Sequence, residues 1–246
     1  MTKTILFLLT ILPTVLFGQE TKKVTEENKN DWFKEVYYVL KSDKSIRHGN
    51  YQKSGYKEAV LINGFYKNGL KDSIWTEYQW SGKNKKSIGT YSEDKKVGTW
   101  EFYDYKGELE QKYDYTKNEI IYFKLDDKEK DKDFRVIKDS DTTKTKLDRP
   151  PLYIGGSAMM FEPILKNIQY PPQAKENGVS GKVYITFTID SNGKTSNHRV
   201  TKGIGSGCDE EALRVVKEIP DNWLPGLLSG QAVNVEYVLP ISFTLN

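Results

Sequence analysis

Cysteine and histidine are the residue types that this 246-residue chain most clearly lacks. It has one cysteine, Cys208, and two histidines, His48 and His198. A single thiol excludes an internal disulfide, and neither histidine has a partner at metal-site spacing. We expect Cys208 to be a half-buried small hydrophobic side chain, with a reactive thiol beside a helix start as the alternative. With no catalytic constellation present, the sequence predicts no enzyme activity, no metal and no cofactor.

Long apolar runs are also scarce. The longest lies at the start, where Lys3 precedes Ile5–Phe17 and Gly18 follows. A helix that spans a bilayer needs about 20 apolar residues, and this run has about 13. A basic residue, an apolar run and a small residue in this order predict a signal peptide over residues 1–18, cleaved near Gly18. The alternative is a short, uncleaved membrane anchor.

An excess of charge of one sign is missing too. The 37 Lys and Arg residues stand against 34 Asp and Glu residues, which excludes a strong electrostatic footprint, so no nucleic-acid partner is predicted. The densest run of charge, Asp126–Arg149, holds eight acidic and eight basic residues and no proline. This composition predicts a solvated linker over residues 126–150 that separates two domains.

What the first half does contain is a repeat with an offset of 25 residues. The aligned pairs are Gly64 and Gly89, Tyr66 and Tyr91, Lys71 and Lys96, Trp75 and Trp100, Tyr78 and Tyr103, and Gly82 and Gly107. Each copy alternates aromatic and polar residues, which predicts β-hairpins that bury an aromatic face against their neighbours. The repeat domain is predicted over residues 47–125, after a lead-in over residues 19–46.

The texture of the repeat, Gly-x-Tyr followed by Gly-x-Trp-x-x-Tyr, resembles MORN repeats over about residues 47–115. The resemblance implies an array that meets lipids or partner proteins. An aromatic stripe at strand spacing is more typical of a core, and we expect that role here.

The chain after Tyr170 has the clearest pattern of secondary structure. Tyr170-Pro171-Pro172 predicts the first turn of a short helix that ends at Asn177-Gly178. Residues 183–189 alternate apolar and polar side chains, which predicts a half-buried strand. The turn residues Asp190–Gly193 then predict a hairpin whose second strand ends near Thr201.

A helix and a long strand complete this pattern. The carboxylates of Asp209–Glu211 suit a helix start, and Pro220 ends the helix. From Val233 to Leu245, apolar and polar side chains alternate again. We therefore predict an α+β C-terminal domain made of a two-stranded hairpin, a helix and a long last strand. An all-β repeat domain of antiparallel hairpins precedes it.

Pro240 lies inside the predicted last strand. Proline cannot donate to a strand ladder, so we expect this part of the strand at a sheet edge or a bulge. An exposed edge offers unpaired backbone groups to an added peptide strand, so the pattern favours β-augmentation. The alternative is that Pro240 only protects the edge from aggregation.

Several separated motifs resemble the TonB C-terminal domain family over residues 151–246. In chain order they are Tyr153-Ile154-Gly155-Gly156, Tyr170-Pro171, Gly178-Val179-Ser180-Gly181, Asp190-Ser191-Asn192-Gly193, Glu211–Val216, Trp223-Leu224-Pro225-Gly226 and Leu239–Phe243. The resemblance implies a periplasmic domain that pairs its last strand with a short segment of an outer-membrane receptor. It also implies an energy transducer that transmits force from an inner-membrane motor.

The same resemblance implies the site and its partners. The implied partner-binding residues are Tyr170, Pro171, Val233, Asn234, Val235, Glu236, Tyr237, Val238 and Leu239. The implied partner is an outer-membrane TonB-dependent receptor or another periplasmic protein, with an ExbB/ExbD-type motor if the chain is anchored. A homodimer stays an open alternative.

The chain departs from the family at its start and in its linker. Its first apolar run is short, and the linker contains no long proline-rich spacer. We therefore expect a periplasmic protein after cleavage, with an inner-membrane anchored form as the alternative. The functional alternative is a soluble periplasmic structural or adaptor protein that binds proteins through the repeat sheet without motor coupling.

Overall fold

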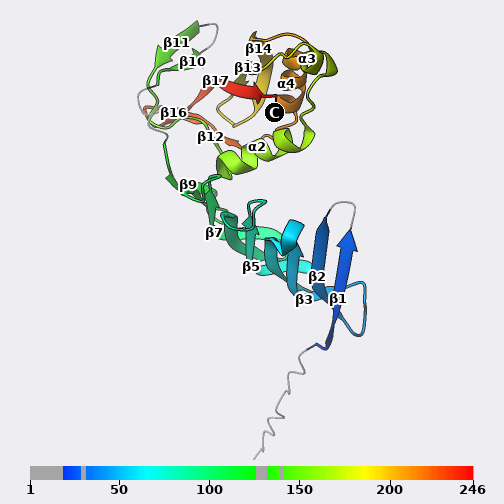
Figure 1. Cartoon of the computed structure of the whole chain (residues 1–246). Helices are drawn as coiled ribbons and strands as arrows, with labels where there is room; N and C mark the ends of the chain where they lie inside the picture. The colour runs from blue at the N-terminus through cyan, green and yellow to red at the C-terminus, as the bar shows by residue number, and fades with distance from the viewer. Residues whose placement is uncertain (1–18, 29–31, 126–131, 139–140, 246) are drawn as a thin grey trace, which may run out of the picture.

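The computed structural model describes residues 19–28, 32–125, 132–138 and 141–245 (Figure 1). The predicted signal peptide, residues 1–18, lies outside the described residues. In the described ranges, no helix has both the length and the apolar character needed to cross a bilayer.

An antiparallel sheet of nine strands forms the N-terminal half, and each strand pairs with the next one in sequence. Its strands are β1 Thr21–Asn28, β2 Phe33–Leu40, β3 Arg47–Ser54, β4 Val60–Lys67, β5 Leu70–Tyr78, β6 Lys85–Ser92, β7 Lys95–Tyr103, β8 Leu109–Asp114 and β9 Glu119–Phe123. A 3-10 turn, Tyr56–Glu58, precedes β4. The sheet confirms the predicted all-β region and also includes β1 and β2, which come from the predicted lead-in.

The glycines of the repeat make room for tryptophan rings. A Cβ atom at Gly64 would lie 2.2 Å from the Trp75 ring, and one at Gly89 would lie 2.1 Å from the Trp100 ring. Both tryptophans are almost fully buried although they lie on a single sheet. The 25-residue period therefore reflects a repeated contact in which an indole ring covers the glycine of the preceding strand.

Tyrosines fill the spaces between the tryptophans. Tyr66 and Tyr91 contact Trp75 edge to face, with ring centroids 5.1 and 5.8 Å away. Tyr91 and Tyr115 make the same kind of contact with Trp100, at 5.0 and 6.0 Å. Edge-to-face pairs at such spacings are favourable beyond the area they bury. The aromatic stripe is thus the core of the repeat sheet, as the sequence predicts.

The C-terminal half is an α+β domain, which confirms the predicted fold class (Figure 1). Its main sheet has the order β11-β10-β17-β13-β14, and β16 pairs with β17 outside this path. These strands are β10 Phe134–Lys138, β11 Asp141–Thr145, β13 Gly181–Ile189, β14 Thr195–Lys202, β16 Gly226–Leu228 and β17 Gln231–Phe243. A small second sheet pairs β12 Leu152–Tyr153 with β15 Trp223–Leu224.

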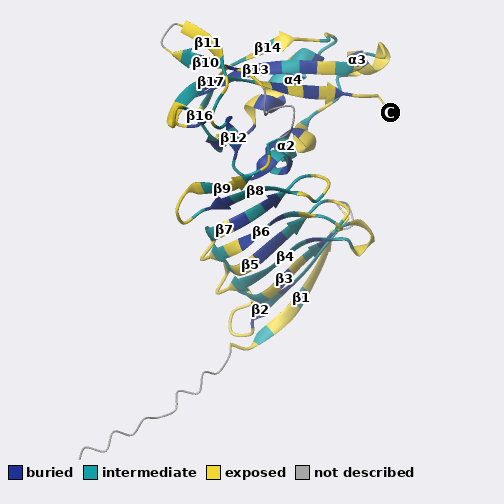
Figure 2. Cartoon of the chain, turned by 90° about the vertical axis from the view of Figure 1, so that its left-hand side faces the viewer, coloured by how far each residue is buried: buried dark blue, intermediate teal, exposed yellow. Residues whose placement is uncertain are grey.

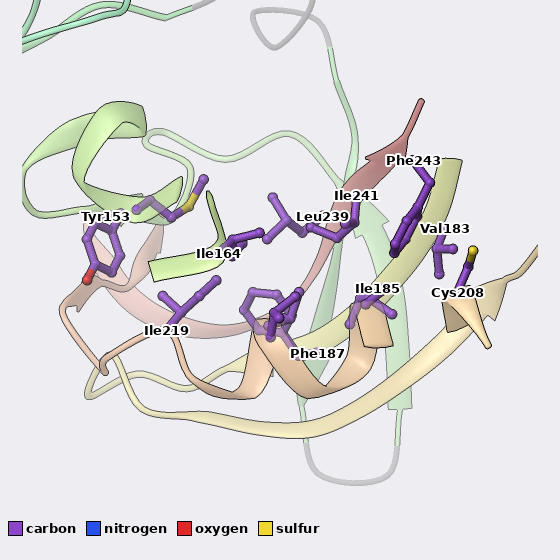
Figure 3. Close-up of a cluster of buried hydrophobic side chains, with 14 of the residues drawn as sticks. Tyr153, Ile164, Val183, Ile185, Phe187, Cys208, Ile219, Leu239, Ile241 and Phe243 are labelled. Carbon is purple, nitrogen blue, oxygen red and sulfur yellow. The ribbon is translucent and has the colours of Figure 1, made fainter. Parts of the chain in front are cut away.

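Three helices belong to this domain: α2 Gly156–Asn167, α3 Pro172–Glu176 and α4 Cys208–Lys217. The core lies between the helices and the sheet, where Ile185 and Phe187 of β13 meet Leu239 and Ile241 of β17 (Figure 3). Cys208 is fully buried in this core, and burial raises the pKa of its thiol. The side chain packs as a small hydrophobic residue and is more deeply buried than the half-buried position that the sequence predicts.

Helix α2 is an element that the sequence analysis did not predict. It contains Pro163 in its interior, and Gly155, in the left-handed conformation with φ of 109°, stands at its N-cap without a side-chain cap. Proline in a helix interior removes one backbone hydrogen bond, so it is a poor helix signal. Burial of Ala158, Met160 and Ile164 provides the stabilisation that local propensity lacks.

The predicted linker differs from a free solvated coil. Strands β10 and β11 form a hairpin within it, and β10 pairs with β17. Phe134 and Val136 of β10 are only 4% and 5% exposed. Alternation of apolar and charged residues in Phe134–Lys138 is a strand signal that the high overall charge obscures.

The two halves of the chain contact each other through buried hydrogen bonds. The Gln111 amide of β8 donates to the Tyr153 carbonyl at 3.1 Å and accepts from the Gly155 N–H at 2.7 Å. The Glu110 carboxylate accepts from both the N–H and the hydroxyl of Ser157, at 3.0 and 2.8 Å. Figure 2 shows α2 lying against the end of the nine-stranded sheet near β8 and β9.

Candidate partner-binding edge

The last strand, β17, has a long partner on one side and a short one on the other. Strand β13 pairs with it over Val235–Phe243, in nine residue pairs. On the opposite side, β10 pairs with it over three residues, Asn234 to Glu236. Within the described ranges, no strand pairs with this second side between Val238 and Phe243. We call this stretch the open edge of β17.

Pro240 lies in the open edge and faces Tyr184 of β13 in the ladder. Because proline has no N–H, it fits a strand where the donor would point away from the neighbouring strand. Backbone donors point the same way at alternate residues, so the N–H groups of Val238 and Ser242 point away from β13 as well. The open edge therefore carries backbone groups that an added strand can pair with.

Glu236 is an acidic residue in the part of β17 that β10 covers. Its side chain is 9% exposed, and it forms ion pairs with Arg199 of β14 and with Arg135 of β10. The Arg135 pair has an N to O distance of 3.1 Å. A carboxylate this buried needs partners, since removing one partner of a buried pair leaves an uncompensated charge. Glu236 thus fixes the position of a cation on β10.

The other predicted contact residues of β17 divide between its two faces. Val235 and Leu239 are buried in the domain core and are not accessible to a partner's side chains. Val238 is 40% exposed on the opposite face. Asn234 accepts a hydrogen bond from the Ser191 N–H at 2.8 Å, which joins β17 to the hairpin turn. Val233 pairs with Gly226 of β16.

Tyr237 connects the open edge to the aromatic part of the core. Its ring lies 5.6 Å from Phe187 and 5.1 Å from Trp223, measured between centroids. Lys132, just before β10, lies over both the Tyr237 ring and the Phe134 ring. Tyr237 is therefore a packing residue at the boundary between the covered and the open parts of β17.

Tyr170 and Pro171 lie at the far end of the strand. The Tyr170 hydroxyl donates to the Val179 carbonyl at 2.5 Å, and its ring stacks edge to face on Phe243 at 5.6 Å. Phe243 lies four positions after Leu239, the last residue of the predicted contact segment, which is about 13 Å along the strand. The structure thus places Tyr170 at the end of the open edge and not beside Asn234 or Glu236.

Sequence reasoning missed the residues that come from the linker and from β14. Arg135, Val136 and Ile137 pair with part of β17, and Arg199 forms an ion pair with Glu236 from the other side. A usable signal was the apolar, basic, apolar order of residues 134–136 inside an otherwise polar run. No group of three or more His, Cys, Asp or Glu side chains in the described ranges is arranged to hold a metal ion.

The C-terminal part of the chain, which contains β17, is similar to a known protein family. Residues 166–245 match the family model of the Gram-negative bacterial TonB protein C-terminal. The match runs from the end of α2 through β17, so it includes the open edge, whereas β10 and β11 lie before it. The TonB C-terminal family is transport-associated and non-enzymatic. Searches of the curated proteins and of the solved structures found no match to this chain.

The region that resembles TonB thus has an added strand on the edge of its last strand. The hairpin β10–β11 extends its sheet beyond the matched residues, and β11 is the outermost strand (Figure 2). The covered residues Asn234 to Glu236 and the open edge together form the candidate partner-binding edge.

Proposed function

We propose that this chain is a cell-envelope protein whose TonB-like domain binds an extended segment of an outer-membrane receptor by strand addition to β17, in support of TonB-dependent transport. The domain would act in the periplasm. An ExbB/ExbD-type motor would be a further partner if the first apolar segment is retained as an anchor. No catalytic step is part of this function.

The observation that carries the proposal is the open edge within the matched residues. A strand that has backbone groups without a strand partner is the surface on which β-augmentation takes place. The half-exposed Val238 offers a side-chain contact on the face away from the core. Backbone pairing would supply affinity, and contacts of this kind would supply specificity.

One substitution tests this edge with little effect on the rest of the sheet. Val238→Pro removes an N–H that points away from β13, and Val238→Thr is a matched control that keeps it. We expect peptides from the periplasm-facing N-terminal segments of outer-membrane receptors to bind the wild-type chain and the Thr variant similarly. Binding to the Pro variant should weaken at least tenfold in fluorescence anisotropy, and equal affinity for all three would contradict the proposal.

A second function, binding of a protein through the repeat sheet, is favoured by a groove between this sheet and α2. The groove has a volume of about 720 Å³ and is lined by exposed Trp80, by Tyr105 and by Leu165, among others. A groove of this size with exposed aromatic rings is typical of a binding site. In this adaptor function, Trp80→Ala would abolish partner capture while Val238→Pro would not.

The mature N-terminus decides whether motor coupling is part of the function. Mass spectrometry of the native protein, with fractionation of the cell envelope, measures where the chain begins. We expect a mature chain that starts near Gln19 in the soluble periplasm. A chain that keeps Met1–Phe17 in the inner membrane would overturn this expectation and would favour coupling to a motor.

A further inference from the structure

We infer that β10 is an internal occupant of the covered part of the partner-binding edge, and that a partner strand that pairs beyond the open edge, over Asn234 to Glu236, displaces it with an extended segment of apolar, basic, apolar order. The inference rests on the proposed function, because it specifies which strand competes for the edge and what the competing peptide looks like. Three features of the structure support it: the short pairing of β10, the side chains that hold β10 on β17, and the burial of Glu236.

The first observation is that β10 has only a short pairing with β17. It forms three residue pairs with β17, whereas β13 forms nine. Its outer neighbour β11 is exposed over most of its length. A two-stranded hairpin has marginal stability by itself, so attachment to β17 holds β10 in place. A strand held by so few pairs can be exchanged without loss of the domain core.

The second observation is the pattern by which β10 is held. Phe134 and Val136 are buried, and between them Arg135 reaches Glu236. If β10 left, the sites of both apolar side chains and of the cation would need new occupants. A competing peptide would meet these needs with apolar residues two positions apart and a Lys or Arg between them.

The third observation is the burial of the Glu236 carboxylate. Its side chain is 9% exposed, and Arg199 would remain as its partner after β10 had left. Without Arg135, the Glu236 carboxylate would keep only one of its two cationic partners. An incoming strand with a Lys or Arg at this position would therefore be favoured. An acidic residue at that position would meet repulsion, so Glu236 determines specificity as well as affinity.

A reversible cross-link tests whether β10 must leave. Val136 faces Val235 in the ladder, and Val235 N–H points toward β13, so the two Cα atoms form a non-hydrogen-bonded pair about 4.5 Å apart. This spacing suits a disulfide. In the full chain with Val136→Cys and Val235→Cys, oxidation should fix β10 on β17, and reduction should release it. Cys208 is fully buried and should not interfere.

The probe is a labelled peptide that copies residues 132–138, KDFRVIK. We expect it to bind the reduced double variant and to bind the oxidised form at least tenfold more weakly. Wild type treated with the same oxidant is the control and should not change. Equal binding of the oxidised and reduced forms, or no binding to the reduced form, would overturn the inference.

A second variant tests the same competition without a cross-link. Val136→Pro removes a strand residue from β10, and Val136→Ile is its matched control. The peptide should bind the Pro variant at least tenfold more tightly than wild type, and the Ile variant like wild type. A peptide with Glu in place of Arg, KDFEVIK, should bind the Pro variant at least tenfold more weakly than KDFRVIK. Unchanged affinity in either comparison would contradict the inference.

The same variants separate this inference from the proposed function. If receptor segments bind wild type and the Val136→Pro variant equally well, strand addition is supported, but the inference that β10 competes for the edge is wrong. If KDFRVIK binds as expected and no receptor segment binds any variant, the competition by β10 is supported, and the proposed binding of an outer-membrane receptor is contradicted.

Discussion

In the repeat sheet, two glycines allow tryptophan rings to pack directly against the backbone of the neighbouring strand. Gly64 and Gly89 have no side chain where Trp75 and Trp100 lie, and any Cβ atom would overlap the indole ring. The indole N–H groups donate to carbonyls ten residues earlier, Phe65 and Thr90, both at 3.1 Å. In each repeat the glycine and the tryptophan therefore depend on each other, because the ring occupies the space that a side chain on the glycine would need.

Gly89→Ala should destabilise the chain by about 1 to 3 kcal/mol, the usual range for overpacking a filled core. The reason is the predicted overlap with Trp100, which must move. Thr90→Ala is the control, because Thr90 is exposed on the same strand and its loss should cost less than about 0.5 kcal/mol. Chemical denaturation measures both values, and equal midpoints for the two variants would contradict this account.

His198 should make stability depend on pH. Its ring stacks on Phe187 at 5.0 Å, and burial, with nearby Lys217, lowers its pKa while Asp221 opposes the shift. Below about pH 6.5 the unfolded chain takes up a proton more readily than the folded chain. This contribution to stability is therefore present above about pH 6.5 and is lost as the pH falls.

We expect His198→Phe, which keeps a ring against Phe187, to flatten the decrease in unfolding free energy between about pH 7 and 5. Ser196→Ala, an exposed change on the same strand, should keep the wild-type dependence. Urea denaturation at a series of pH values measures the slope. A His198→Phe variant with the wild-type slope would show that His198 does not contribute.

Elements of two or three residues can still be central to packing, as β15 shows. Trp223 of β15 is 6% exposed and contacts Tyr153, Phe187 and Tyr237 at centroid distances of 5.2, 5.8 and 5.1 Å. In the described structure its indole N–H has no hydrogen-bond partner. Its contribution is therefore that of an apolar ring between the two sheets of the domain.

Trp223→Ala should destabilise the domain by about 3 to 5 kcal/mol, the range for removal of a buried aromatic side chain. Trp223→Phe should cost clearly less, because it keeps a ring and loses only an N–H without an acceptor. Thermal and chemical denaturation measure both variants. A Trp223→Ala chain with an unchanged midpoint would mean that the ring is not part of the core.

The sequence predicted the elements in which local signals and burial agree. Strands β13 and β17 have alternating apolar and polar residues, and α3 begins at Pro172. Helix α2 was missed because Pro163 conflicts with helix propensity, and β10 was missed because charged residues surround its two buried side chains. The edge of β17 was predicted from Pro240, but its covered part was not, since pairing between residues 234–236 and 135–137 is a long-range contact.

At the scale of the whole molecule, the two halves contact each other through the buried Gln111 and the partly buried Glu110 of β8. Burial raises the pKa of Glu110, although its hydrogen bonds to Ser157 oppose the shift. An ion pair between Lys86 of β6 and Glu162 of α2, at 3.0 Å, adds a partly exposed contact at the same boundary. Contacts of α2 and of the segment before it therefore join the C-terminal domain to the repeat sheet.

Gln111→Ala should loosen this boundary, because it leaves the Tyr153 carbonyl and the Gly155 N–H buried without their partner. The cost of such unsatisfied groups is about 1 to 3 kcal/mol each. Hydrogen exchange of the Gly155 amide measures the effect directly, and we expect it to become at least tenfold faster. Gln52→Ala, at an exposed position of β3, is the matched control and should leave this amide unchanged. If Gly155 exchanged at the wild-type rate in the Gln111→Ala chain, Gln111 would not hold the two halves together, and the repeat sheet would be independent of the C-terminal domain.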